Sequence, residues 1–323
     1  MSYVPQDLAA MKRSFFSSPE TPVKCSFPVL LTKVVLFQAA RALAFLHHKH
    51  IVHRDLKPAN ILIDPDTFRV QLCDLGSAKQ IVSPSSAKNV SYICSRYYRA
   101  PELLFGSLHY DAEVDLWSLG CIAAEMLRTG GKVLFKGTTT MDQMAEIFKV
   151  LGAPSRQEMF LMNPQAAEAM AVTHEHYRNS GSFPSSIQEH SAVMGEEGTT
   201  TSTVDEESDY NHNYNVLKIS ALPMDKVLSQ DASASGVQLI QQLLTYAPQK
   251  RMTAVQVLQH EFFADLFTDS QKDSEVVRLP NGKPLPVEMF LLTRQETAYL
   301  PSALQEKMTR EAEKIKETIV RKK

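Results

Sequence analysis

The longest regular hydrophobic pattern in this chain covers residues 29–48. Leu30, Val34 and Phe37 begin an apolar stripe at helical spacing, and Arg41 is a polar break within it. A stripe of this length predicts a long helix with most of its surface buried. The helix would deliver the chain directly into the polar segment that follows.

Shorter patterns predict the other elements. Apolar residues at helical spacing predict a helix that starts after Pro5. The short runs Ile-Leu-Ile and Val-Gln-Leu, joined by an Asp-Pro-Asp turn, predict short strands at 61–63 and 70–72. A helix and a following loop are expected over Met141–Asn163. A charged helix is expected on the surface over residues 301–323.

The hydrophobic pattern breaks between about Gln165 and Asn215, where Ser, Thr, Gly, Glu and His dominate. Within this stretch, Gly195–Asp209 carries six carboxylates and no Lys or Arg. Such a composition cannot bury enough apolar surface to offset the entropy lost on ordering. Residues 166–212 are therefore predicted to be a disordered acidic insertion.

Composition and charge restrict the class of protein. Apolar residues make up 44% of the 323 residues and charged residues 22%, which is ordinary for a globular protein. The formal net charge of −2 gives no basic field that would attract nucleic acid or a membrane, and no apolar run is expected to span one. The four cysteines form no C-x-x-C pair, so reduced thiols in the cytosol or nucleus are expected rather than disulfides or a zinc site.

The candidate chemistry lies in His-Arg-Asp-Leu-Lys-Pro-Ala-Asn, residues 53–60. This segment matches the protein-kinase catalytic loop H-R-D-x-x-x-x-N at every fixed position. Phosphoryl transfer needs a carboxylate to orient the attacking hydroxyl and accept its proton, the role expected for Asp55. It also needs an amide oxygen on Mg²⁺, the role expected for Asn60. Lys57 would place a cation beside the phosphoryl group. An Asp-rich turn between a helix and a strand is the structural alternative.

Two later motifs follow in the right order and spacing. Residues 72–76, Leu-Cys-Asp-Leu-Gly, place Asp74 where a kinase carries the Asp of D-F-G, the main Mg²⁺ ligand, with Leu75 in place of the Phe. Residues 100–102, Ala-Pro-Glu, match the A-P-E that closes the activation segment.

Longer stretches resemble the glycogen synthase kinase-3 family. They are Tyr3-Val-Pro5, Asp64-Pro-Asp-Thr67, Leu72-Cys-Asp74, Gly76–Gln80, Val90–Leu103, Val150-Leu-Gly152, Met162-Asn-Pro164 and Leu279-Pro-Asn-Gly282. The resemblance covers about residues 3–165 and 213–297, and it implies a protein kinase that uses ATP and Mg²⁺. The Leu-Lys-Pro form of the loop resembles serine/threonine kinases, so protein substrates modified on Ser or Thr are expected.

The resemblance assigns further roles residue by residue. The backbone of Val4 would hydrogen-bond adenine, and Leu62 would pack beneath it. Arg54 and Lys79 match two of three basic residues with which the family holds a phosphate already present on the substrate; each is also interpretable as a surface cation. Tyr92 matches an activating phosphotyrosine, with an ordinary aromatic anchor as the alternative.

Other matched positions would be structural or would bind partners. Asp115 would accept backbone N–H bonds from the catalytic loop, and Glu102 would form an internal ion pair with Arg251. In the family, the surface over Met141–Asn163 receives an amphipathic helix of scaffold proteins; a helix that packs only within the domain is the alternative. The acidic insertion is interpretable as a solvated loop or as an internal mimic of a phosphorylated substrate.

Together these patterns predict a mainly α fold: the large C-terminal lobe of a protein kinase with a few short strands, lacking the small β-rich ATP lobe. The reason is that no G-x-G and no V-A-I-K-like strand precedes the catalytic loop. The expected organisation is a hinge remnant (1–5), the lobe (6–265), a packed extension (266–300) and the charged tail (301–323). Two functions stay open: a serine/threonine kinase that is N-terminally truncated and has little activity alone, and a non-catalytic protein-interaction module.

Overall fold

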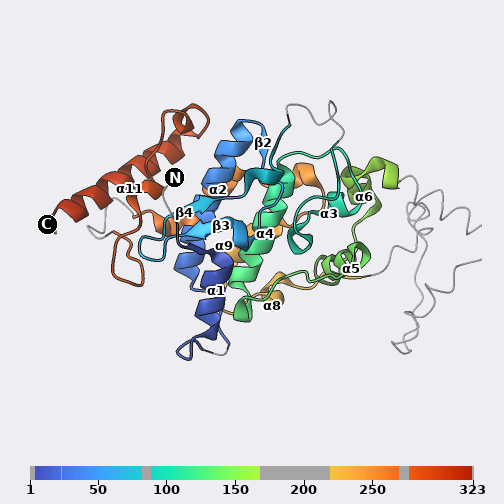
Figure 1. Ribbon diagram of the computed structural model, residues 1–323, viewed down its shortest axis with the longest axis horizontal. Helices are drawn as coiled ribbons and strands as arrows, with labels where there is room; N and C mark the ends of the chain where they lie inside the picture. Colours follow the sequence, from blue (N-terminus) through green and yellow to red (C-terminus); the bar gives the residue numbers. More distant parts are fainter. Residues whose placement is uncertain (1–3, 23, 82–88, 168–218, 269–275, 322–323) are drawn as a thin grey trace, which may run out of the picture.

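The computed structural model describes residues 4–22, 24–81, 89–167, 219–268 and 276–321. Most of its elements are helices, with the small strands set beside them. Helix α11 lies at one end of the long axis, and α5 and α6 lie at the other (Figure 1). The predicted insertion lies outside the described residues from position 168 onward.

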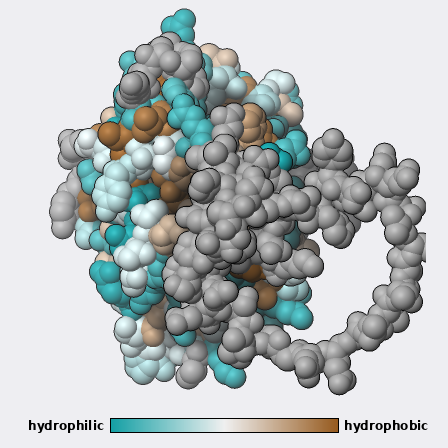
Figure 2. Space-filling model, turned by 90° about the vertical axis from the view of Figure 1, so that its right-hand side faces the viewer, coloured by the Kyte–Doolittle hydropathy of each residue, from teal (hydrophilic) through white to brown (hydrophobic). Residues whose placement is uncertain are grey.

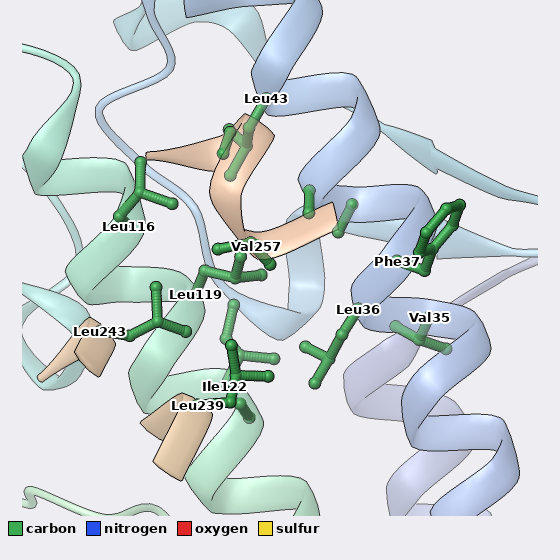
Figure 3. Packing of buried hydrophobic residues seen from close by; sticks show 14 of the residues in the cluster. Val35, Leu36, Phe37, Leu43, Leu116, Leu119, Ile122, Leu239, Leu243 and Val257 are labelled. Atoms are coloured by element: carbon green, nitrogen blue, oxygen red, sulfur yellow. The ribbon is translucent and has the colours of Figure 1, made fainter. Parts of the chain in front are cut away.

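Two long helices form the centre of the fold. Helix α2 (Val29–His48) packs against α4 (Glu113–Leu127), and α9 (Ala234–Leu243) and α10 (Ala254–Leu258) pack around them. Val257 of α10 lies between the two long helices in the close view of the core (Figure 3). Helix α4 approaches α9 closely at Gly120, where a Cβ atom would lie 2.8 Å from that of Leu243. A larger residue there would force these helices apart.

The strands form two small antiparallel sheets. The first has the order β1 (Gln6–Asp7), β3 (Ile61–Ile63), β4 (Val70–Leu72), and the second pairs β2 (Ile51–Val52) with β5 (Lys79–Gln80). Helix α1 (Leu8–Ser17) begins directly after β1, where the Asp7 side chain accepts a hydrogen bond from Ala10 N at 2.7 Å. This cap satisfies one of the free N–H groups of the first turn.

Five further helices lie within the described residues. They are α3 (Pro101–Leu104), α5 (Thr140–Leu151), α6 (Arg156–Met162), α8 (Met224–Val227) and α11 (Ser302–Val320). Short 3₁₀ turns connect these elements, at Pro58–Asn60, Leu75–Ser77, Arg96–Tyr98, Thr129–Gly131, Pro248–Lys250, Glu261–Leu266, Val287–Met289 and Glu296–Ala298. Helix α11 buries Leu304, Met308 and Ile315, so the charged tail packs on the domain through one apolar face.

Helix α2 is long and apolar enough to cross a membrane by length and composition. This corrects the expectation that no apolar run approaches that length. In the structure, 61% of its most apolar window is buried by the rest of the protein. A central core helix is surrounded by other elements on most of its faces, and its composition follows from that position.

The local predictions agree with the structure where the hydrophobic pattern is strong. The helix at residues 29–48 and the strands at 61–63 and 70–72 are confirmed with the same bounds. The tail helix is confirmed over Ser302–Val320. Over Met141–Asn163 the expected helix (α5) and the loop after it are confirmed, and a second helix, α6, follows the loop, where Ser155 begins it with a capping box that Glu158 completes.

Candidate active site

One buried carboxylate holds the loop of residues 53–60. Asp115, in the first turn of α4, accepts hydrogen bonds from the backbone N–H groups of His53 (2.8 Å) and Arg54 (2.9 Å). His47 Nε2 of α2 lies 2.9 Å from the same carboxylate. Arg54 adopts a left-handed backbone with φ 65°, which costs about 1–3 kcal/mol for a residue with a side chain. The bonds to Asp115 stabilise this conformation.

Both carboxylate oxygens of Asp55 are hydrogen-bonded. Oδ1 accepts from the backbone N–H (2.9 Å) and the hydroxyl (2.8 Å) of Ser95, and Oδ2 accepts from Lys57 Nζ at 2.7 Å. Asn60 Nδ2 donates to the backbone oxygen of Asp55 at 2.8 Å and to Oδ2 at 3.2 Å. The carboxylate is therefore fixed in orientation by three side chains and one backbone group.

These bonds also keep Asp55 ionised. Burial alone would raise the pKa of its carboxyl, but the hydrogen bonds from Lys57 and Ser95 and the charge of Lys57 outweigh burial. The pKa of Asp55 consequently lies below its ordinary value. A carboxylate in this state is ready to accept a hydrogen bond from an incoming hydroxyl group.

Asn60 and Asp74 belong to segments joined by one backbone hydrogen bond and one contact from a side chain to the backbone. Cys73 N donates to Asn60 O at 3.0 Å, and His53 Nε2 lies 3.0 Å from Cys73 O. Asn60 Nδ2 donates to Asp55, and no described residue donates a hydrogen bond to the amide oxygen of Asn60. Asp74 has a left-handed backbone (φ 62°), and the part of the chain that the structure describes donates no hydrogen bond to its carboxylate.

A carboxylate and an amide oxygen are ligands that suit Mg²⁺. The described residues contain no group of three or more His, Cys, Asp or Glu side chains that would hold a metal ion by themselves. Mg²⁺ usually keeps several waters or phosphate oxygens and takes only one or two carboxylates from the protein. The chemistry of Asn60 and Asp74 therefore fits a metal ion shared with a phosphate ligand.

Val4 and Leu62, which were expected to flank adenine, lie on the side of the site that carries the three-stranded sheet. Strand β1 begins two residues after Val4 and places Asp7 opposite Leu62 of β3. Both Val4 and Leu62 are half-buried. Their apolar side chains are thus partly accessible, as the wall of a ligand site must be.

The two cations expected to bind phosphate lie on elements that meet beside the loop. Lys79 of β5 pairs in register with Val52 of β2, one residue before His53. Arg54 Nε donates to Ser77 O at 2.6 Å, and Lys79 Nζ donates to Asn89 Oδ1 at 2.7 Å. In the described ranges neither cation forms a salt bridge, whereas Lys57 pairs with Asp55. Their positive charge is available to an anion.

Tyr92 is 74% exposed, and its ring lies over the guanidinium of Arg99, 4.5 Å from the ring centroid. Arg99 also donates to Ile93 O (2.7 Å) and Cys94 O (2.8 Å), the two residues that precede Ser95. Arg99 thus connects the ring of Tyr92 to the backbone just before Ser95, the residue that binds Asp55.

Glu102 and Arg251 form an ion pair at the base of this segment. Arg251 Nη1 and Nη2 donate to the two carboxylate oxygens of Glu102, each at 2.6 Å, and both side chains are at most 1% exposed. The remaining donors of Arg251 bind the backbone oxygens of Thr245, Tyr246 and Glu113. A fully bonded guanidinium of this kind fixes the chain around it and is not accessible to substrate.

Sequence reasoning missed three residues of the site: Ser95, Asn89 and Tyr110. Ser95 lies within the long stretch from Val90 to Leu103 that carried the family resemblance, so its position was visible although its role was not. Tyr110 and Asn89 are each 5% exposed and contact Arg54 and Lys79 respectively. A single buried Tyr or Asn gives no signal in one sequence, because its partners are distant along the chain.

A comparison with known families shows where this chain belongs. The family model described as "Protein kinase domain" matches residues 9–263, which is more than half of the chain. This match corrects the predicted fold class, a large lobe that lacks the small β-rich ATP lobe: the match assigns residues 9–263 to the kinase domain itself. The prediction rested on the absence of two short motifs, and such an absence carries less weight than a match over most of the chain.

Proposed function

The chain belongs to the protein kinase domain family, and we propose that it is a serine/threonine kinase of the glycogen synthase kinase-3 type. It would transfer the γ-phosphate of Mg-ATP to Ser or Thr side chains of proteins. The observation that carries this proposal is the arrangement around Asp55: Lys57 and Ser95 keep its carboxylate ionised, and Asn60 helps to fix its position.

Each residue of this arrangement has a place in phosphoryl transfer. Asp55 orients the substrate hydroxyl and accepts its proton. Lys57, which holds Oδ2 of Asp55, brings a positive charge to the place where the phosphoryl group is transferred. Asn60 and Asp74 would hold Mg²⁺, which supplies charge neutralisation at the phosphates when it is bound. Val4 and Leu62 would contact the adenine.

Two cations that form no salt bridge within the described residues support a preference for substrates that already carry a phosphate. Arg54 and Lys79 lie next to the loop and have no carboxylate partner in the described part of the chain. A phosphoserine carries about −1.5 to −2 charges at neutral pH and accepts several hydrogen bonds. The two cations would therefore favour a primed substrate. Tyr92 would be a site of activating phosphorylation, because its hydroxyl-bearing ring is exposed.

A scaffold helix would bind over Met141–Asn163. Met141 of α5 is 71% exposed and Phe160 of α6 is 49% exposed, whereas Ile147 of α5 is buried. Helix α5 thus packs on the core through one face, and α5 and α6 each present an apolar side chain to solvent. Figure 2 views the molecule from the end that carries α5 and α6 and shows apolar patches among polar residues. This surface also supports the second candidate function, a protein-interaction module without catalysis.

A kinase assay separates the two candidates. The purified chain is incubated with Mg-ATP and peptides that contain serine, threonine or tyrosine, and transfer is compared for the wild type, Asp55→Asn and Asp225→Asn. The last is a matched control, because Asp225 is exposed on α8. We expect transfer to Ser and Thr peptides by the wild type and the control only. Equal signals from the wild type and Asp55→Asn would reject the catalytic proposal and leave the interaction module.

A further inference from the structure

One buried hydroxyl connects the two sides of the proposed phosphate site. Tyr110 is 5% exposed, and its OH accepts a hydrogen bond from Arg54 Nη1 at 3.1 Å and donates one to Val90 O at 3.0 Å. Its acceptor and its donor are therefore both used. Tyr110 follows the A-P-E motif by eight residues and belongs to none of the motifs that predicted the site.

The first bond fixes the guanidinium of Arg54. Arg54 Nε donates to Ser77 O at 2.6 Å, so Ser77 and Tyr110 bind two adjacent nitrogens and set the plane of the group. Nη2 has no partner among the residues that the structure describes. A guanidinium fixed at two nitrogens with the third open is prepared to bind an anion, because little side-chain entropy is left to lose.

The second bond reaches the segment that binds the other cation. Val90 follows Asn89, whose Oδ1 accepts from Lys79 Nζ at 2.7 Å. The same segment is held by a backbone bond from Asn89 N to Leu108 O at 3.4 Å. Tyr110 thus sets where Arg54 lies relative to the segment that orients Lys79.

The hydroxyl keeps its proton over the range in which phosphoserine is a dianion. Burial raises the pKa of Tyr110 above its ordinary value of 10.0, although the hydrogen bond from Arg54 lowers it. The phenol therefore remains a donor to Val90 O at neutral pH.

We propose that Tyr110 is a positioning residue for the phosphate-binding site: it holds Arg54 in register with Lys79, and the chain's preference for phosphorylated substrates depends on its hydroxyl. This inference rests on the proposed function and deepens it. A phosphate bound by both cations gains from their fixed spacing, since correct placement of charged donors adds affinity without new contacts.

The test compares Tyr110→Phe with Tyr246→Phe. Tyr246 is a matched control, because it is also 5% exposed and its OH also donates to a backbone oxygen, that of Gly152 at 2.6 Å. Fluorescence anisotropy measures the affinity of each protein for peptides with an acceptor serine and a phosphoserine at varied spacing. Unphosphorylated peptides of the same sequences are measured beside them, and this binding readout does not require turnover.

In the wild type we expect tighter binding of the phosphorylated peptides. Tyr110→Phe should reduce the ratio of the two affinities by about tenfold, equivalent to about 1.4 kcal/mol. In kinetics the loss should fall mainly on KM for the primed peptide rather than on kcat, and the affinity for phosphorylated peptides should fall more than that for unphosphorylated ones. Tyr246→Phe should keep the wild-type ratio of the two affinities, even if its Tm falls as much as that of Tyr110→Phe.

A second readout reports on Arg54 directly. The ¹⁵N resonance of Arg54 Nε, assigned by Arg54→Lys, should show restrained rotation in the wild type and faster rotation in Tyr110→Phe. An unchanged affinity ratio in Tyr110→Phe, or equal losses for both kinds of peptide, would overturn the positioning role. A wild type without any preference for phosphopeptides would reject the phosphate site of the proposed function, and the positioning role would fall with it.

Discussion

Ser95 donates two hydrogen bonds to a single oxygen of Asp55, one from its backbone N–H at 2.9 Å and one from its hydroxyl at 2.8 Å. The two residues are 40 positions apart in the sequence. The activation segment is therefore bonded directly to the proposed catalytic base. A movement of this segment would change both the orientation and the pKa of Asp55.

Removal of the Ser95 hydroxyl should slow catalysis. Ser95→Ala keeps the backbone bond and loses the hydroxyl bond to a charged group, worth about 1.5–3 kcal/mol, so kcat should fall by roughly 10- to 100-fold. The acid limb of the pH–rate profile should move to higher pH, because a bond that lowers the pKa of Asp55 is gone.

Ser95→Thr should retain most of the rate, since threonine keeps the hydroxyl. Ser229→Ala is the control: its hydroxyl also binds a carboxylate, Asp231 Oδ2 at 3.2 Å. Steady-state and single-turnover kinetics measure the effect. A Ser95→Ala enzyme with wild-type kcat and pH profile would show that the hydroxyl has no part in catalysis.

The proposed metal ligands should be visible in nucleotide binding. Addition of Mg-ATP should raise the Tm of the wild type, because a ligand that binds only the native state stabilises it. In Asp74→Asn the additional shift that Mg²⁺ gives over ATP with EDTA should be lost. Exposed Asp225→Asn should keep it, and differential scanning fluorimetry measures all three proteins. If the Mg²⁺-dependent shift survives in Asp74→Asn, Asp74 is not a metal ligand.

The buried pair of Glu102 and Arg251 should dominate the stability of this region. Arg251→Ala would leave the Glu102 carboxylate buried and unpaired, which costs about 3–5 kcal/mol. Urea unfolding measures the loss. Replacement of both residues by leucine should recover the part of the loss that comes from the unpaired charge, while the backbone oxygens of Thr245, Tyr246 and Glu113 stay without their Arg251 donors. A double variant less stable than Arg251→Ala would contradict this account.

Arg41 Nε and Nη2 donate to the two carboxylate oxygens of Glu296, at 2.5 and 2.8 Å. This pair should make stability depend on pH. Burial alone would raise the pKa of Glu296, but hydrogen bonds from Arg41 and Thr293 outweigh it and place the pKa below its ordinary value of 4.5. A carboxyl group with a lowered folded-state pKa stabilises the protein above its unfolded-state pKa. It loses that contribution as pH falls through the folded-state value.

The wild type should therefore exceed Glu296→Gln in free energy of unfolding at pH 7, and the difference should shrink as the pH is lowered below about 4.5. Urea unfolding at several pH values measures this difference. A gap that stays constant down to pH 3 would show that the ionised form of Glu296 contributes no stability through Arg41.

Some features of the fold could be predicted from the sequence because they depend on local pattern. The helix at 29–48 and the strands at 61–63 and 70–72 were predicted with their observed bounds, since the apolar spacing of each fits its own period. The loop from His53 to Asn60 could also be located from local pattern. Asp55, Lys57 and Asn60 all lie within these eight consecutive residues. The absence of a short motif was a poorer guide, and it gave the wrong fold class.

The tertiary structure alone decided how these residues are joined to distant ones. Ser95 binds Asp55 and Tyr110 binds Arg54, across 40 and 56 positions of sequence, and Asp115 holds the loop from another helix. A single sequence contains propensities and spacings, which act over a few residues. Contacts between residues far apart in the chain arise only when α2, α4 and the small sheets pack around one core, and that packing selects which side chains meet.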